Sequence, residues 1–380
     1  MTKVKVCILQ NGLSRGGTDT FVLNLCKGLN KEQFDITVVN PSSRPGSRVL
    51  EADVEATGAR IVHTSDLGQG IMSKLRHFVQ LYRLLRRERF DVFHTNIDLF
   101  NGPNLLVARL AGVPVRCCHS HNGMQQKALV EGLTLPIRVY QSVMRWMCWH
   151  FSNRRTGCSE IAMEFLFAGR PWRQKEYPSV IYNGIDLNTY RTPIDVDKKR
   201  AELGLTAKHH IVTVGRIIPQ KNPQFIAESF AALCRTRTDC DLVWVGVGEL
   251  EQQCRKILEQ NNVADRVHFL GSRSDVSEIL QCCDMFYLPS NFEGLGIVVI
   301  EAQASGLPCL VSDVVPFEAD CGMCRYISLQ DDVSQWVQTM SDMIDGNIPL
   351  TIDEKRMQRY SIEYMVKQME QVFTVNKIIK

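Results

Sequence analysis

Short apolar runs alternate along the chain with segments long enough to form helices. In the first half these runs predict β-strands over residues 4–9, 34–40, 60–63, 90–96, 115–121, 155–159 and 180–183. The alternation restarts in the second half, where strands are predicted over residues 211–215, 242–246, 267–271, 285–289 and 308–312. Near-continuous apolar strands separated by helices are typical of parallel sheets that are covered on both faces. The pattern therefore predicts an α/β protein with two Rossmann-like domains.

The joint between the two series is predicted at Asn183-Gly184-Ile185-Asp186, a turn-prone tetrapeptide that follows the last strand of the first half. We expect one domain over residues 1–183 and a second domain over residues 184–360. Residues 361–380 then remain as a separate C-terminal helix.

Two helical segments in the first half combine apolar and basic residues. Apolar positions between Ile71 and Arg89 follow helical spacing, and five basic residues lie largely off that stripe: Lys74, Arg76, Arg83, Arg86 and Arg87. Residues 135–155 place aromatic residues among arginines. The simpler interpretation is two helices packed on the sheet with a solvated basic face. The alternative is peripheral contact with an anionic membrane, because basic and aromatic side chains suit the headgroup region.

The composition is that of an ordinary globular protein. Of the 380 residues, 44% are hydrophobic and 22% charged, and no apolar run approaches the ~20 residues that span a bilayer. The N-terminal residues lack the apolar region of a signal peptide, so we expect a cytoplasmic protein. The single Cys-x-x-Cys motif, Cys321 to Cys324, has no second pair at zinc spacing. We expect the 14 cysteines to be reduced thiols, mostly buried, and we expect no metal site.

The net charge of +3 conceals an asymmetry between the two halves of the chain. Residues 1–183 carry 24 Lys and Arg against 14 Asp and Glu, whereas residues 184–380 carry 20 against 27. A basic half favours an anionic surface or an anionic substrate. Neither half contains a nucleic-acid recognition motif, so we expect no nucleic-acid partner.

Two predicted strand-to-helix loops carry groups that could bind an anion. Gly16 and Gly17 follow the first strand and precede a helix expected from about residue 20. Glycines permit a tight turn and close approach of a ligand, and a helix N-terminus offers free N–H groups. Arg216 and Lys221 occupy the same place after the first strand of the second half, where two cations suit a diphosphate. Plain turns with solvated charges are the alternative in both places.

The strongest local signal lies in residues 291–308, where Glu293 and Glu301 are separated by seven residues. If a helix begins near Gly296, Glu301 lies one to two turns into it and Glu293 lies on the preceding loop. A loop glutamate can accept hydrogen bonds from sugar hydroxyls, and a helical one can bind a ribose diol. The backbone amides of Leu295 and Gly296 would be open to phosphate or sugar oxygens. The alternative is ordinary helix-start chemistry, with an acidic residue near the positive end of the helix dipole.

Four motifs together resemble family 4 retaining glycosyltransferases of the GT-B fold. They are the Glu-x7-Glu segment, the Gly-Arg…Lys-Asn-Pro loop at 215–223, the Asn-Gly-Ile-Asp joint and the N-terminal Gly-Gly turn. The His-Ser-His-Asn motif at 119–122 resembles the exopolysaccharide and capsule subgroup. The resemblance implies two Rossmann-like domains facing across a cleft, with a final helix that crosses back to the N-terminal domain. The chain departs from the commonest pattern at Asp19 and Gly296, where many relatives have Glu and Pro, which leaves the sugar open.

The resemblance implies roles for the residues of the second half. Arg216 and Lys221 would bind the donor diphosphate. Glu301 would bind the nucleotide ribose, and Glu293 would contact the transferred sugar. Leu295 and Gly296 would belong to the donor-binding loop.

In the first half, Gly16 and Gly17 would close on the same diphosphate. His121 matches the active-site histidine at the end of a strand, and protonated it would help to stabilise the leaving diphosphate. His119, two residues earlier on the same side of the strand, is its competitor. His121, His119 and Glu293 are therefore the candidate catalytic residues.

The implied reaction moves a hexose from a nucleotide-diphosphate sugar, with UDP favoured over GDP, to a lipid-linked or polysaccharide acceptor. The anomeric configuration would be retained, and neither a metal nor another cofactor would be needed, because cationic side chains stabilise the leaving group. Asp195 and Asp197 imitate a metal-binding pattern but lie in a charged connector, and we interpret them as solvated. A lipid-linked acceptor would bring a cytoplasmic enzyme to the membrane. A sugar-nucleotide 2-epimerase and a non-catalytic nucleotide-sugar-binding subunit remain as alternatives.

Overall fold

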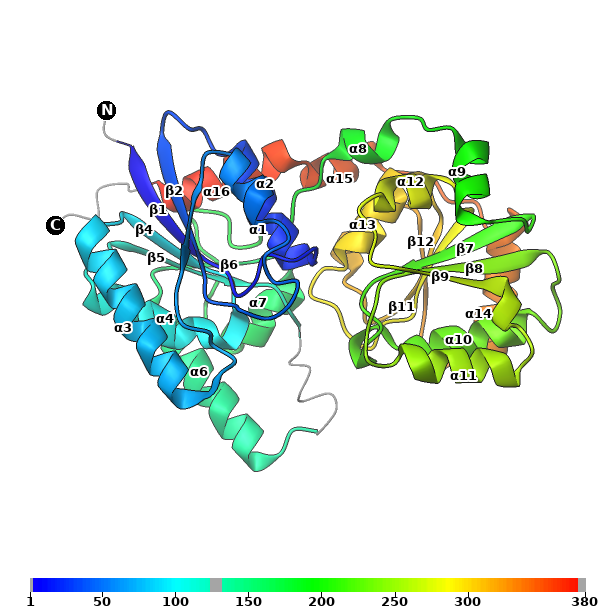
Figure 1. The fold of residues 1–380 in the computed structure, drawn as a ribbon, viewed down its shortest axis with the longest axis horizontal. Helices are drawn as coiled ribbons and strands as arrows, with labels where there is room; N and C mark the ends of the chain where they lie inside the picture. Colours follow the sequence, from blue (N-terminus) through cyan, green and yellow to red (C-terminus); the bar gives the residue numbers. More distant parts are fainter. Residues whose placement is uncertain (1–2, 124–131, 375–380) are drawn as a thin grey trace. The chain divides into compact units, whose positions relative to one another are not determined.

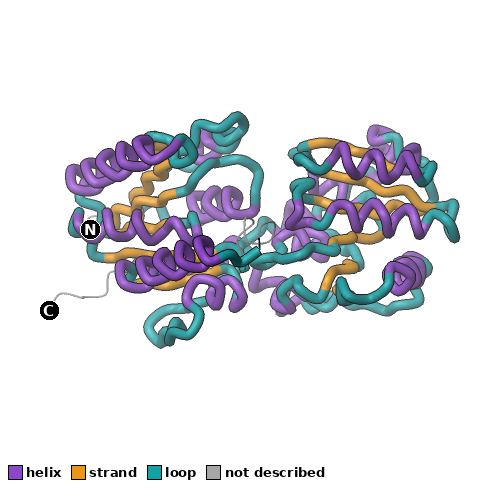
Figure 2. Tube along the Cα trace, turned by 90° about the horizontal axis from the view of Figure 1, so that it is seen from below, coloured by secondary structure: helices purple, strands orange, loops and turns teal. Residues whose placement is uncertain are grey.

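The chain forms two compact units, as the computed structural model in Figure 1 shows. The structure describes residues 3–123 and 132–374. Unit 1 comprises residues 3–123, 132–185 and 359–374, and unit 2 comprises residues 186–358. Each unit contains one six-stranded parallel sheet with helices on both faces (Figures 1 and 2). The predicted α/β class with two Rossmann-like domains is confirmed.

The sheet of unit 1 has the strand order β3-β2-β1-β4-β5-β6. Its strands are β1 (Val4–Leu9), β2 (Phe34–Asn40), β3 (Arg60–His63), β4 (Val92–Thr95), β5 (Val115–Ser120) and β6 (Arg154–Gly157). One face is covered by α1 (Gly17–Gly28), α2 (Glu51–Ala56) and α16 (Ile362–Phe373). The other face is covered by α3 (Gly70–Glu88), η1 (Asp98–Phe100), α4 (Asn101–Leu110), α6 (Leu135–Phe151) and α7 (Glu160–Phe167). From Val6 to Leu9 both faces of β1 are buried, which explains why this part of the strand is apolar without alternation.

The last helix, α16, completes the core of unit 1 by packing against α1, the red and blue helices of Figure 1. A Cβ atom at Gly28 of α1 would lie 2.4 Å from Cγ2 of Val366, so the close approach of the two helices requires glycine there. Met365, Met369 and Phe373 are fully buried. Residues 375–380 of the predicted C-terminal helix lie outside the described residues.

The sheet of unit 2 has the strand order β12-β11-β10-β7-β8-β9. Its strands are β7 (His209–Val214), β8 (Cys240–Val245), β9 (Val267–Gly271), β10 (Met285–Leu288), β11 (Cys309–Ser312) and β12 (Cys324–Ile327). Helices α10 (Pro223–Leu233), α11 (Glu251–Gln260) and α14 (Val333–Ile344) share the core on one face. The remaining helices are α8 (Leu187–Arg191), α9 (Val196–Leu203), α12 (Val276–Gln281), α13 (Ile297–Ala304) and α15 (Glu354–Met357), with the short η2 (Pro219–Lys221), η3 (Ala264–Arg266), η4 (Phe317–Ala319) and η5 (Gln358–Tyr360).

Both sheets reverse their strand order at the first strand of the unit. In unit 1 this point lies between β1 and β4, and in unit 2 it lies between β7 and β10. In open α/β sheets, ligands bind outside the carboxyl ends of the strands at such a reversal. The loops that follow these four strands are therefore where the fold places a binding site in each unit.

Residues 180–183 do not form the predicted strand. Val180 makes only an isolated bridge with Gly157. Beyond it the backbone turns to the C-terminal segment, where the N–H of Ile185 donates to the carbonyl of Tyr360 at 2.7 Å. The hydrogen bonds of this extended segment are thus divided between the sheet edge and the C-terminal residues.

Two further elements differ from the sequence analysis. Strand β12 was not predicted, because Arg325 interrupts a four-residue run at the edge of the sheet. Helix α1 begins at Gly17, earlier than the expected residue 20, because the carbonyl of Gly16 already accepts hydrogen bonds from the N–H groups of Asp19 and Thr20.

The described residues include no helix that is both long enough and apolar enough to cross a bilayer. All 14 cysteines are free thiols, and most of them are buried.

Candidate functional site

In unit 2, two loops meet at the reversal of strand order. One loop follows β7 and passes through η2, and the other follows β10 and leads into α13. Asn291 joins them, since its backbone N–H donates to the carbonyl of Gln220 at 2.8 Å and its Nδ2 donates to the carbonyl of Pro219 at 2.7 Å. The first loop is also held on its other side, where the N–H of Ile217 donates to the carbonyl of Val247 at 3.0 Å. Both loops therefore have a fixed backbone.

An ion pair between Lys221 and Glu293 connects the same two loops. Lys221 Nζ lies 2.6 Å from Glu293 Oε1, and the side chains are only 16% and 6% exposed. Ser290 Oγ donates to the same carboxylate oxygen at 2.7 Å, and Gln220 Nε2 lies 3.4 Å from the other oxygen. A charged pair with additional hydrogen-bond donors is stronger than a solvated one and is held in one geometry. The sequence analysis gave the two residues separate roles and did not predict their contact.

Gly215 makes room for this lysine at the end of β7. Its φ of +151° and the 3.0 Å between an added Cβ atom and Lys221 Cε both favour glycine. The lysine side chain can therefore lie directly against the backbone at the end of the strand.

Arg216, Leu295 and Gly296 offer polar groups at the same end of the sheet. The Arg216 side chain is exposed, and no ion pair to its guanidinium is present in the described part of the chain. Gly296 precedes α13 with a φ of +79°, and within residues 3–123 and 132–374 the N–H groups of Leu295 and Gly296 have no hydrogen-bond partner. The arrangement suits a ligand that carries several oxygen atoms and negative charge.

Glu301 lies on α13, which begins at Ile297, close to the predicted start. Burial raises the pKa of Glu301, while a hydrogen bond from Tyr190 and the positive charge of Lys221 lower it. Burial and the charge of Glu301 raise the pKa of Tyr190, so its hydroxyl stays protonated and donates to the carboxylate. Tyr190 belongs to α8, which packs against α13. Tyr190 therefore holds Glu301, a role that the sequence analysis missed.

In unit 1, the loop after β1 is closed by Asp19 around Gly16 and Gly17. The buried Asp19 carboxylate accepts hydrogen bonds from the N–H of Ser14 at 3.0 Å and from Gln10 Nε2 at 2.6 Å. Burial raises the pKa of Asp19, and these hydrogen bonds lower it. A Cβ atom at Gly16 would lie 3.3 Å from Asp19 Oδ2, so the carboxylate lies under the turn and the backbone of Gly16 faces solvent.

His119 and His121 stand at the end of β5, with their ring centroids 4.5 Å apart. His119 is fully buried and its Nδ1 lies 2.8 Å from Thr156 Oγ1, whereas His121 lies just beyond the strand and is 6% exposed. Phe21 of α1 contacts both rings, at 4.9 and 5.1 Å, and so links the histidines to the helix that begins at Gly17. The position of His121 at the strand end favours it over His119 for contact with a ligand.

His121 is held by two residues that follow β4. Its backbone N–H donates to Asp98 Oδ1 at 2.9 Å, and its Nε2 lies 3.0 Å from Asn96 Oδ1. Burial lowers the pKa of His121 to about 3, so the ring is neutral at neutral pH in this structure. Burial disfavours a charged ring in this structure, and protonation of His121 during the reaction stays a prediction.

A third histidine, His94 of β4, completes this cluster. It is fully buried, and its ring centroid lies 5.6 Å from that of His119 and 5.4 Å from that of Phe373. Neither of its ring nitrogens has a hydrogen-bond partner among the described residues. Burial lowers its pKa to about 3. The cluster is thus polar, neutral and costly to bury.

No group of three or more His, Cys, Asp or Glu in the described part of the chain has a geometry that could hold a metal ion. Asp195 accepts a hydrogen bond from the N–H of Lys198 at 3.0 Å and so caps α9, and Asp197 lies in the first turn of that helix. The apparent metal motif is a helix start.

The sequence analysis did not identify several residues of the site, although the sequence contains a signal for two of them. Asn96 and Asp98 directly follow β4, which places polar groups at the carboxyl end of a strand beside the reversal. Tyr190 and His94 carried no such signal, because nothing in their local sequence shows which side chains they meet.

Comparison with known proteins identifies the class of this fold. Residues 15–189 match the family described as Glycosyltransferase Family 4, and residues 195–322 match Glycosyl transferases group 1. Among solved structures, Anabaena Alr3699/HepE in complex with UDP aligns with a TM-score of 0.75 at 17% identity, covering 97% of this chain and 99% of that chain. The fold is therefore GT-B, as the sequence predicts.

Two curated relatives are similar over most of their length. The putative glycosyltransferase EpsF of Bacillus subtilis is 31% identical over 343 residues, which cover 89% of this chain and 87% of EpsF. The Escherichia coli UDP-Gal:alpha-D-GlcNAc-diphosphoundecaprenol alpha-1,3-galactosyltransferase is 31% identical over 323 residues, 82% of this chain and 80% of that protein. The chain belongs to family 4 of the glycosyltransferases and is a hexosyltransferase-type enzyme. The predicted likeness to the exopolysaccharide and capsule subgroup is confirmed.

Replacing His94 by leucine should make unit 1 less sensitive to acid. The pKa of His94 is about 3 in the folded chain, against about 6.5 when unfolded. As the pH falls below about 6.5, only the unfolded state takes up this proton, so stability present at neutral pH is lost towards pH 3. The free energy of unfolding should therefore fall less steeply with decreasing pH in His94→Leu than in the unchanged chain. We expect the slope between about pH 6 and pH 4 to be smaller by about 1.4 kcal/mol per pH unit.

Urea unfolding at a series of pH values measures this slope. His150→Leu, the same replacement on an exposed position of α6, is the matched control. An unchanged slope in His94→Leu would contradict the account of the cluster.

Replacing Tyr190 by phenylalanine removes the hydroxyl that donates to Glu301. The pKa of Glu301 should rise, because burial then acts with less opposition, and the carboxylate should be lost at a higher pH. A hydrogen bond to a charged group contributes about 1.5–3 kcal/mol. For the UDP donor proposed below, we therefore expect the acidic limit of binding to move up by about one to two pH units, with little change at alkaline pH. Calorimetric titration with UDP measures this limit, and Tyr364→Phe, at an exposed tyrosine of α16, is the control. Identical pH profiles would refute the role given to Tyr190.

Proposed function

We propose that this enzyme transfers a hexose from a UDP-sugar to a lipid-linked or polysaccharide acceptor, with retention of the anomeric configuration and without a bound metal or other cofactor. The observation that carries the proposal is the group of Lys221, Glu293 and Glu301 at the strand-order reversal of unit 2. A cation, an ion-paired carboxylate and a partly buried carboxylate within one fixed loop pair fit the diphosphate, the sugar and the ribose of such a donor.

The cationic groups would stabilise the charge that develops on the leaving diphosphate when the anomeric bond breaks. Lys221 is fixed beside the end of β7, and Arg216 on the same loop is exposed and free to fold onto the phosphates. The N–H groups of Leu295 and Gly296 would add donors for the same oxygens. Preorganised donors of this kind supply the stabilisation that a divalent ion supplies in other transferases.

The two glutamates would have different duties. Glu301, held by Tyr190, would accept hydrogen bonds from the two ribose hydroxyls. Glu293 would contact the hydroxyls of the sugar through the oxygen that Lys221 and Ser290 leave less engaged. Glu301 would therefore contribute mainly to donor binding, and Glu293 would act on the sugar that is transferred.

Unit 1 would contribute Gly16, Gly17 and a histidine. The exposed turn at Gly16 and the start of α1 offer backbone N–H groups to a phosphate. His121 is neutral in this structure and would act as a hydrogen-bond partner of the sugar. His119 is committed to Thr156 and would position its neighbour.

The donor and the acceptor of the proposal are supported by relatives. Anabaena Alr3699/HepE has been solved with UDP-glucose, and the Escherichia coli relative is named for a UDP-Gal donor and a diphosphoundecaprenol acceptor. A Campylobacter jejuni relative, 27% identical over 309 residues, is also named for a diphospho-undecaprenol acceptor. An acceptor of this kind would place the enzyme at the cytoplasmic face of a membrane as a peripheral protein.

A donor screen tests the proposed reaction. We expect release of UDP from a UDP-hexose to rise when a lipid-linked acceptor is added, and we expect EDTA to leave the rate unchanged. NMR of the product should show the same anomeric configuration as the donor. The UDP donor would be refuted by release from GDP-sugars only. Metal independence would be refuted by a loss of activity in EDTA that divalent ions restore, and retention would be refuted by an inverted product. Conversion of the donor to its 2-epimer without an acceptor would show that the enzyme is a sugar-nucleotide 2-epimerase instead.

The roles of the glutamates are separated by alanine variants. Glu301→Ala should weaken UDP binding about 10- to 100-fold, as expected for the loss of hydrogen bonds to a charged group. Glu293→Ala should lower kcat about 100-fold, with a much smaller change in UDP affinity. Glu259→Ala, at the exposed end of α11, is the control. Binding by calorimetry and turnover by UDP release give the two readouts, and unchanged values in both variants would remove the site assignment.

A further inference from the structure

Helix α3 of unit 1 has an apolar stripe that faces away from the protein. Its buried residues are His77, Leu81, Leu84 and Leu85. The large apolar residues of the opposite side are exposed: Ile71 by 76%, Met72 by 64%, Leu75 by 50%, Val79 by 48% and Tyr82 by 40%. Helical periodicity reveals an apolar stripe in the sequence, but it cannot show whether that stripe faces the core or the solvent. The outer face of α3 therefore carries large apolar side chains beside its exposed arginines.

Helix α6 repeats this arrangement on the same face of the sheet. Its buried residues are Ile137, Gln141 and Cys148. Its exposed apolar residues recur at helical spacing: Leu135 by 74%, Val139 by 54%, Val143 by 47% and Trp146 by 48%. Two helices on one face that both present large apolar side chains to water are unusual, because scattered single residues are the norm on a soluble surface.

Helix α4 joins the two stripes into one surface. It packs against both α3 and α6, and all three lie on the same side of the unit 1 sheet in Figure 1. At its C-terminal end Arg109 Nη1 donates to the carbonyl of His150 of α6 at 3.5 Å. Gly112, just beyond α4, is so close to Arg86 of α3 that an added Cβ atom would lie 3.8 Å from Nη1. Leu110 between them is 64% exposed.

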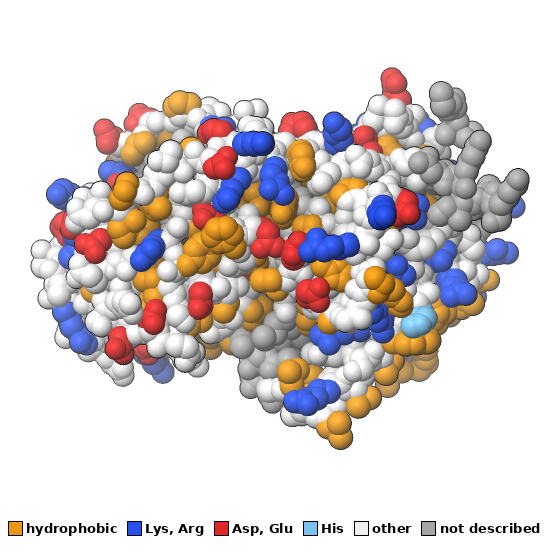
Figure 3. All heavy atoms as spheres, turned by 180° about the vertical axis from the view of Figure 1, so that it is seen from behind, with side chains coloured by type: hydrophobic (Ala, Val, Ile, Leu, Met, Phe, Trp, Pro, Cys, Tyr) orange, Lys and Arg blue, Asp and Glu red, His pale blue; other side chains and the backbone are white. Residues whose placement is uncertain are grey.

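The charge on this surface is of one sign. Helix α6 contains no Asp or Glu, and the only acidic residue of α3 is its last, Glu88, which pairs with Arg60 and Arg87. Arg83 and Arg86 form no ion pair with any residue in the described ranges. In Figure 3, hydrophobic side chains and Lys or Arg side chains gather together over unit 1. A surface of this kind complements an anionic and partly apolar partner.

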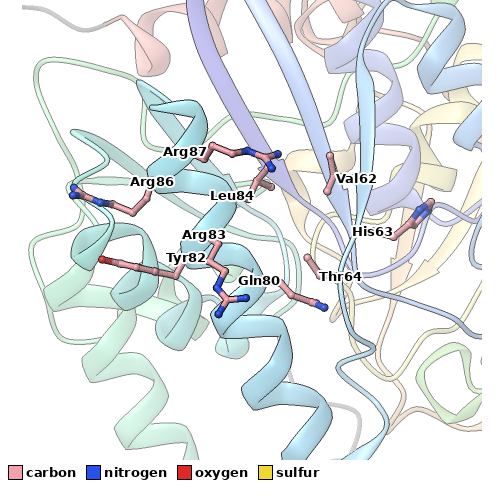
Figure 4. A pocket seen from close by; sticks show the side chains of 9 residues that line it. All are labelled: Val62, His63, Thr64, Gln80, Tyr82, Arg83, Leu84, Arg86 and Arg87. Carbon is pink, nitrogen blue, oxygen red and sulfur yellow. The ribbon is translucent and has the colours of Figure 1, made fainter.

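A groove beside α3 is lined by several of the arginines of that helix. It measures about 680 Å³ and lies between the end of β3 and the C-terminal half of α3. Figure 4 shows Arg87 and Gln80 turned toward β3, while Arg86 and Tyr82 point away from it. Arginines therefore project on both sides of the helix, so that headgroup phosphates could be bound on either flank of the apolar stripe.

We propose that the outward faces of α3 and α6, joined by the end of α4, dock this enzyme onto an anionic lipid bilayer. The apolar stripes enter the boundary between headgroups and acyl chains, and the arginines bind the lipid phosphates. Helices with an apolar outer face, flanking cations and aromatic residues lie in the plane of the membrane interface. The inference identifies the attachment surface, and it does not depend on the proposed donor or stereochemistry, because docking requires no nucleotide.

Vesicle sedimentation with the full chain tests the proposal. We expect the protein to bind phosphatidylcholine vesicles that contain phosphatidylglycerol, and to bind pure phosphatidylcholine vesicles far more weakly. Arg83→Gln with Arg86→Gln should weaken binding about five-fold for each arginine. Leu75→Ser with Val79→Ser, and Val139→Ser with Val143→Ser, should each weaken binding about ten-fold or more. Higher salt should suppress the effect of the arginines but not that of the stripes.

Matched controls lie outside the surface. Lys208→Gln with Lys256→Gln removes two exposed lysines of unit 2, and Val49→Ser removes an exposed apolar residue of unit 1 near α2. Both should leave vesicle binding unchanged, and retained UDP binding in every variant shows that the chain has folded. Absence of vesicle binding, or binding that the α3 and α6 variants leave unchanged, overturns the proposal. A dimer in light scattering that the same variants dissociate, without vesicle binding, would assign the surface to a second copy of the chain.

Discussion

The ion pair between Lys221 and Glu293 determines how the chemistry of unit 2 is arranged. It closes the two loops on either side of the strand-order reversal, and Ser290 and Gln220 supply the hydrogen bonds that offset the desolvation of the carboxylate. Such a pair adds little to stability, because most of its attraction is lost to desolvation. Its value here is positional, since it fixes the side chains of Lys221 and Glu293 between two loops whose backbones Asn291 joins.

Among the described residues, unit 1 has no ion pair at the corresponding point, the carboxyl ends of β1 and β4. The same end of its sheet presents a backbone turn and buried, neutral histidines, of which His94 has no hydrogen-bond partner among the described residues. Burying unpaired nitrogens reduces stability, and a sequence selected for stability alone would place apolar side chains there. The two units thus share one strand order but differ in polar groups at the corresponding point, with an ion pair in unit 2 and buried histidines in unit 1.

The sequence predicts the strands well where both faces are buried. The bounds of β1 and β2 agree with the prediction, because most residues of both strands are apolar and buried. It fails at residues 180–183, whose hydrogen bonds are divided between the sheet edge and residues far away in the sequence. The motif residues Arg216, Lys221, Glu293 and Glu301 could be found locally. The hydrogen bond of Tyr190 to Glu301 could not, since only the packing of α8 on α13 creates it.

The position of α16 has a consequence for the biosynthesis of the protein. Most of unit 1 precedes unit 2 in the chain, yet Met365, Met369 and Phe373 belong to the core of unit 1 and are translated only after unit 2. A nascent chain that has left the ribosome as far as β6 therefore still presents the apolar side of α1 to water. Unit 1 can therefore complete its core only after α16 has been synthesised, and until then its apolar surface needs protection from aggregation.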